Sequence, residues 1–144
     1  QGSTINPEYL EWSGVAAFKH AYQIYKERGY RTRLLSAAFR NTKHWSELLG
    51  GDVVISPPYA WQVKINEAEI DPDLHSLEKP VAPEILEALS TLPEFRKAYD
   101  VDGLAVSEFS TYGATARTLR GFLQSTNGLE ALVRDVLIVN PDIV

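Results

Sequence analysis

Two short apolar segments, each followed by a helix-start signal, constrain the fold of this chain more than any other feature. The first covers residues 31–39, with an apolar centre at Leu34 and Leu35, and the second covers residues 52–56, with a β-branched centre. Short apolar segments bounded by turn-forming residues are typical of strands buried on both faces. Strands that alternate with helices are typical of parallel sheets with helical crossovers. The sequence therefore predicts an α/β fold.

Helical patterns flank both segments. Residues 14–28 carry apolar side chains at steps of three and four and are followed by Gly29, which predicts a helix with a left-handed stop. A short helix is expected from residue 41 or 42 to residue 49, and a longer one over residues 57–66 with Ser56 as its N-cap. This order of strand, helix, strand and helix fits two consecutive units of a (β/α)₈ barrel.

The second half of the chain is predicted to be a loop followed by helices. Residues 71–79 are polar and predict a loop, residues 83–89 predict a short helix, and Pro93 is expected to close the next turn. A long amphipathic helix is expected over residues 109–123. A last helix is expected to start at Asn127, where a glutamate three residues later resembles a capping box.

Composition narrows the classes of function. The net charge of −5 and the pI of about 5.2 argue against a nucleic-acid partner. The chain has no cysteine, which excludes disulfides, thiolate zinc sites and cysteine nucleophiles. Its histidines lack metal-ligand spacing, so no metal site is expected. No apolar stretch approaches the roughly 18 residues needed to cross a bilayer, so we expect a soluble, cytoplasmic protein without a membrane partner.

The start of the sequence predicts a fragment. The chain contains no methionine, and residues 1–3 resemble the remnant of a cleavable tag, so the native sequence is expected to begin at residue 4. Two strands alone would leave unpaired N–H and C=O groups along both edges of their sheet. We therefore expect the missing strands to come from an N-terminal remainder of the protein or from self-association.

Three phrases of the sequence resemble the last third of transaldolases. Residues 22–32 are similar to the helix end that leads into the seventh barrel strand of that family. Residues 37–42, AAFRNT, resemble the end of the seventh strand, and residues 51–57, GDVVISP, resemble the eighth. The stretch 104–110 and the helix after it look like the family's C-terminal helix.

This resemblance implies the C-terminal portion of a TIM (β/α)₈ barrel. Residues 4–70 would form about the last two βα units, and residues 71–144 the C-terminal loop and helices of the same domain. The implied activity is the transfer of a three-carbon ketol unit between sugar phosphates through a Schiff-base lysine, with no metal or organic cofactor. In the family that lysine lies on the fourth strand, which is outside this chain, so the 144-residue chain alone is expected to be inactive.

The resemblance also indicates phosphate-binding residues. The family's phosphate-binding arginine corresponds to Arg40, and its serine corresponds to Ala38, which has no hydroxyl group. Ser36, two residues earlier on the strand, is a candidate replacement for that serine. Asn41 and Ser56 also follow the strands, although helix capping is the favoured explanation of both.

No catalytic residue is expected within the chain itself. A Schiff-base lysine needs a buried or cation-flanked site, whereas the lysines here all fall on predicted helices or loops. We therefore expect them to be solvated surface residues: Lys19, Lys26, Lys43, Lys64, Lys79 and Lys97. The alternative function is a non-catalytic or regulatory relative of transaldolase that binds a sugar phosphate or another anion.

Overall fold

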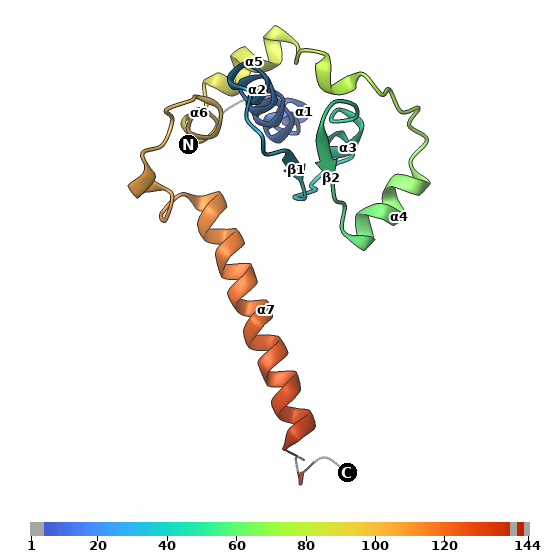
Figure 1. Ribbon diagram of the computed structural model, residues 1–144, viewed down its shortest axis with the longest axis vertical. Helices are drawn as coiled ribbons and strands as arrows, with labels where there is room; N and C mark the ends of the chain where they lie inside the picture. Colours follow the sequence, from blue (N-terminus) through green and yellow to red (C-terminus); the bar gives the residue numbers. More distant parts are fainter. Residues whose placement is uncertain (1–4, 139–140, 143–144) are drawn as a thin grey trace. The chain divides into compact units, whose positions relative to one another are not determined.

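The computed structural model describes residues 5–138 and 141–142, and the chain divides into two compact units, Gln1–Gly103 and Leu104–Val144 (Figure 1). The predicted tag remnant at residues 1–3 lies outside the described residues. The elements of the first unit, in chain order, are α1 (Pro7–Leu10), α2 (Ser13–Arg28), β1 (Leu34–Ser36), α3 (Lys43–Ser46), β2 (Val53–Ile55), α4 (Tyr59–Glu67), the 3₁₀ helix η1 (Ser76–Glu78), α5 (Pro83–Ser90) and α6 (Pro93–Tyr99).

The two strands pair in parallel, as the sequence predicts. Leu34 lies opposite Val53, and Ser36 lies opposite Ile55. Both strands are shorter than the apolar segments that predict them. Leu35 is exposed, so β1 is covered on one face only within this unit. The prediction of a strand buried on both faces is therefore wrong for β1 as it stands in this chain.

Helix α2 organises the core, because adjacent residues on it enter two separate apolar clusters. Ala16 packs with side chains from the segment around α5 and α6, whereas Val15 and Tyr22 pack with Leu48 and Leu77. Gly51 closes the second cluster. It has a positive φ of 67°, and a Cβ there would clash with the Tyr22 hydroxyl group. The end of the turn before β2 is thus fixed against α2.

Three predicted helix boundaries of the first unit are wrong, and proline geometry explains two of them. Helix α4 is preceded by Pro58 and has no side-chain cap, so Ser56 is not its N-cap. A residue that precedes a proline is disfavoured in the helical region, which accounts for a start of α4 after Pro58 and not at Pro57. Pro93 opens α6 instead of closing a turn, because a proline at the first helical position loses no hydrogen bond. Helix α3 ends at Ser46, three residues earlier than predicted.

The second unit contains the 3₁₀ helix η2 (Val106–Glu108) and the long helix α7 (Gly113–Leu137). Figure 1 shows α7 as one uninterrupted helix, so the predicted start of a new helix at Asn127 is wrong. The apolar stripe explains the continuity, because Phe122, Leu129 and Val133 keep the helical phase across that point. None of the described helices is long and apolar enough to span a membrane.

Candidate functional site

The predicted site residues gather where the two parallel strands end. Because β1 and β2 run in parallel, their carboxyl ends lie at the same edge, which is where barrel enzymes bind their substrates. The pairing continues one step beyond the strands, since the Ser56 backbone N–H donates to the Ser36 carbonyl oxygen at 2.9 Å. The structure therefore brings Ser36 and Ser56 together, and Ala38 and Arg40 lie in the segment that leaves β1.

Arg40 is an exposed cation that follows a buried anchor. Phe39 is only 2% exposed, and its ring packs against Trp61 of α4 with the centroids 6.2 Å apart. The Arg40 guanidinium Nη1 donates to the Phe39 carbonyl oxygen at 2.8 Å. Within the described part of the chain, the Phe39 carbonyl oxygen is the one protein partner of the Arg40 guanidinium. The remaining guanidinium donors are therefore available to an anion.

The His44 side chain contacts the backbone around Arg40. Its ring Nδ1 lies 3.0 Å from the Ala38 carbonyl oxygen and 3.1 Å from the Arg40 backbone nitrogen. The Ser36 hydroxyl donates to the His44 carbonyl oxygen at 3.2 Å. Burial lowers the pKa of the His44 imidazole below its usual value. No periodic pattern marks His44, because its ring contacts depend on the irregular turn between β1 and α3.

The Asn41 side chain does not cap α3. Its Nδ2 donates to the Glu11 carbonyl oxygen at 3.1 Å, while the N-cap residue of α3 is Thr42, without a side-chain hydrogen bond. The capping interpretation of Asn41 is therefore wrong, and its amide instead ties the Arg40 segment to the chain just before α2. Helix α3 has one turn and can add little dipole, so anion binding at this edge rests on the Arg40 guanidinium.

Lys19 corrects the expectation that every lysine is solvated. It is 6% exposed, and its Nζ donates to the carbonyl oxygens of Ser76 at 2.8 Å and Lys79 at 2.9 Å. It also forms an ion pair with Glu47 at 3.3 Å. Burial lowers the pKa of the Lys19 ammonium, and the neighbouring Glu47 carboxylate opposes that shift. The helical periodicity could have indicated that Lys19 is buried, because position 19 lies between Val15 and Tyr22 on the buried face of α2.

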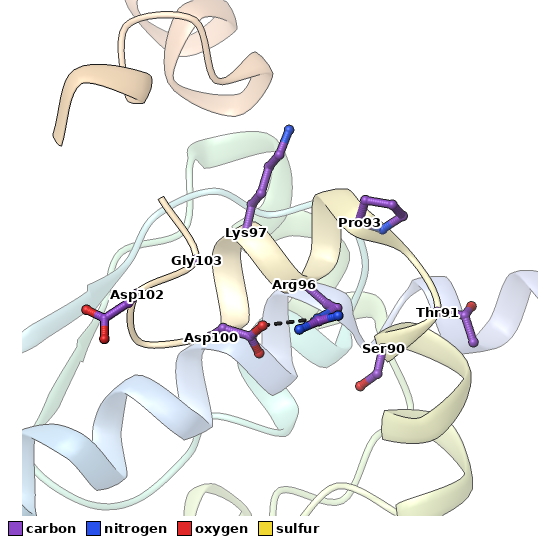
Figure 2. Close-up of a pocket in the computed structure, with 8 residues that line it drawn as sticks. All are labelled: Ser90, Thr91, Pro93, Arg96, Lys97, Asp100, Asp102 and Gly103. Atoms are coloured by element: carbon purple, nitrogen blue, oxygen red, sulfur yellow. Dashed lines mark hydrogen bonds and ion pairs between the residues drawn. The ribbon is translucent and has the colours of Figure 1, made fainter. Parts of the chain in front are cut away.

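A second candidate is the open cavity between the end of α5 and the segment after α6 (Figure 2), with a volume of about 560 Å³. Its wall includes the ion pair between Arg96 Nε and Asp100 Oδ2, at 3.1 Å, which Figure 2 shows as a dashed line. The Arg96 guanidinium is therefore already paired with a carboxylate at the end of the same helix, α6. The cavity also contains none of the residues predicted to bind phosphate, so it is the weaker candidate.

Across residues 5–138 and 141–142, no three or more His, Asp or Glu side chains are grouped so that they could hold a metal ion.

Comparison with curated proteins finds transaldolases along most of the chain. It is 32% identical over 121 residues to the transaldolase of Actinobacillus succinogenes, covering 83% of this chain and 35% of that protein. It is 31% identical over 127 residues to the transaldolase of Methylobacillus flagellatus, covering 86% of this chain and 37% of that protein. It is 28% identical over 141 residues to the transaldolase of Cellvibrio japonicus, covering 93% of this chain and 41% of that protein.

These relatives confirm the resemblance predicted from the phrases of the sequence. No protein-family model matches the chain, and no solved structure matches it. The chain spans between 35% and 41% of the length of the curated relatives named above. It therefore belongs to the transaldolase family, of which it represents a partial segment.

Proposed function

We propose that this chain is the phosphate-binding segment of a transaldolase-type transferase. The full-length protein would transfer a three-carbon ketol unit between sugar phosphates. The observation that carries this proposal is the position of Arg40, an exposed cation just beyond the carboxyl end of a parallel strand in a relative of transaldolases. Membership of that family implies a fragment of a (β/α)₈ barrel, and a two-stranded parallel sheet among helices is compatible with it. We assign β1 and β2 to the last two strands of that barrel.

The chemistry of the site fits the binding of a phosphate dianion. A guanidinium can hold two phosphate oxygens at once, and such charge-assisted hydrogen bonds are worth about 1.5–3 kcal/mol. Ala38 offers no hydroxyl donor, and the Ser36 hydroxyl already donates to the His44 carbonyl oxygen. We therefore expect Arg40 to supply most of the binding free energy that this segment contributes.

The Schiff-base lysine is proposed to lie outside this chain. Burial lowers the pKa of Lys19, but its Nζ donates to two carbonyl oxygens and lies 3.3 Å from the Glu47 carboxylate. Because its donors are engaged within the protein and it lies on helix α2, we do not assign it as the nucleophile. Each remaining lysine lies on a helix or in a loop, and none lies on β1 or β2. These positions support a nucleophile on an earlier strand, as the family resemblance implies.

Reductive trapping tests whether the Schiff-base lysine lies outside this chain. When the amine of a lysine condenses with the ketone of fructose 6-phosphate, water leaves, and borohydride reduces the resulting imine to a stable adduct. The full-length protein should gain this adduct on one lysine and lose its transaldolase activity. The 144-residue chain should keep its mass. An adduct on a lysine of this chain, or none in the full-length protein, would contradict the proposal.

The alternative is a relative that binds an anion without catalysis. The exposed Ala38 favours it, because this position lacks the donor that the family resemblance places there. Turnover of fructose 6-phosphate with an aldose phosphate acceptor separates the two functions. Phosphate binding that depends on Arg40, in a full-length protein without turnover, would establish the alternative.

A further inference from the structure

We propose that His44 is the positioning residue of Arg40, and that its imidazole fixes the loop from which the Arg40 guanidinium reaches an anion. This inference rests on the proposed function, because it concerns the same site. It identifies a residue outside the family phrase as a determinant of phosphate affinity.

The contacts of His44 reach three of the predicted site residues. Its backbone carbonyl oxygen accepts the hydrogen bond of the Ser36 hydroxyl at 3.2 Å, which joins α3 to the end of β1. Its ring Nδ1 lies 3.0 Å from the Ala38 carbonyl oxygen and 3.1 Å from the Arg40 backbone nitrogen. His44 thus holds the root of the loop through its backbone, and its ring lies within hydrogen-bond distance of backbone atoms on both sides of Phe39.

The two ring contacts are alternatives, because Nδ1 has either a proton or a lone pair to offer. In the neutral tautomer with its proton on Nε2, Nδ1 accepts the hydrogen bond of the Arg40 N–H. In the other neutral tautomer, Nδ1 donates to the Ala38 carbonyl oxygen. Either bond closes the loop next to Arg40, so positioning requires a polar atom at Nδ1 and not merely a ring.

The surroundings of the ring favour the neutral forms. Gly14 lies against it at the start of α2, where an added Cβ would be 3.1 Å from Nε2. The charged groups that act on the ring are those of Glu11, Lys43 and Arg40, with two cations against one carboxylate. Burial is the largest influence and lowers the pKa of His44, so the ring stays neutral where phosphate is a dianion.

Two substitutions separate the hydrogen bond from the bulk of the side chain. His44→Leu keeps apolar volume but has no polar atom, whereas His44→Asn places an amide group close to the position of Nδ1. In the full-length protein, His44→Leu should weaken the binding of inorganic phosphate by about two- to tenfold, the value of one neutral hydrogen bond. His44→Asn should stay within about twofold of the wild type, since its amide can make either bond.

The experiment is a calorimetric titration with inorganic phosphate, together with the urea midpoint of each variant. Arg40→Ala is included to test the proposed function separately. If Arg40→Ala binds like the wild type, the proposed function fails. If Arg40→Ala loses binding but His44→Leu stays within about twofold, only the role of His44 is overturned. Equal losses in both His44 variants, in proportion to their losses of stability, would show a merely structural residue and overturn it as well.

Discussion

Replacing Lys19 with methionine removes the charged group at the centre of the first unit while keeping a long apolar side chain. In the native protein the Lys19 ammonium holds the Ser76 and Lys79 carbonyl oxygens and the Glu47 carboxylate. These partners come from the C-cap of α3 and from the segment around η1, so Lys19 joins three parts of the chain that are distant in sequence. The substitution removes this donor from all three acceptors, of which the Ser76 carbonyl oxygen keeps the Lys79 backbone N–H at 3.1 Å.

The expected cost follows from the burial of these partners. Losing one member of a fully buried ion pair costs about 3–5 kcal/mol, because the other charge stays buried and unpaired. Here the Glu47 side chain is 29% exposed and can regain water, which lowers the cost. Relief from burying an ammonium group lowers it further. We therefore expect the free energy of unfolding to fall by about 2–3 kcal/mol, close to one charge-assisted hydrogen bond.

Urea unfolding of the full-length protein measures this change as a shift of the midpoint at constant slope. Lys26→Met is the matched control, because Lys26 lies on the same helix with its side chain 52% exposed and its Nζ 3.9 Å from Glu78. Its loss should cost about 1 kcal/mol or less. If the two variants differ by less than about 1 kcal/mol, Lys19 does not stabilise this unit as its contacts indicate.

Two further predictions concern assembly and pH. Among the residues that the structure describes, Leu35 is exposed and the outer edges of β1 and β2 have no strand partner, so the 144-residue chain should associate. A monodisperse 16.1 kDa monomer in light scattering would contradict this prediction. Since burial lowers the pKa of His44, the unfolded state binds more protons in the range just below its usual value of about 6.5. Wild-type stability should therefore fall, relative to His44→Asn, between about pH 6.5 and pH 5; no difference would contradict this assignment.

Local sequence patterns predict the parallel strands and α2 well, because a period of 3.6 or a short apolar segment is a property of neighbouring residues. The predictions fail where a partner distant in the sequence, or a competing local signal, determines the structure. Lysine is usually solvated, yet Lys19 is buried because carbonyl oxygens more than fifty residues away hold its charge. Asn127 resembles a cap, but the apolar stripe that continues through α7 outweighs it.

The candidate site is predictable only in part for the same reason. Arg40 can be selected from its place after a strand and from the family phrase that contains it. His44 cannot, because its contacts with Ala38 and Arg40 depend on how the turn after β1 folds back. The capping interpretations of Asn41 and Ser56 fail because side-chain and proline geometry in this turn and before α4 set the helix starts.

The binding of a sugar phosphate to Arg40 variants tests the central claim most directly. Calorimetry with fructose 6-phosphate would compare the full-length wild type with Arg40→Ala, with Ala38→Ser and with Arg31→Ala, an exposed arginine at the opposite end of β1. Arg40→Ala should lose about tenfold or more in affinity, and Ala38→Ser should gain about two- to tenfold from its added hydroxyl donor. Arg31→Ala should match the wild type. An Arg40→Ala affinity within about twofold of the wild type would contradict the account.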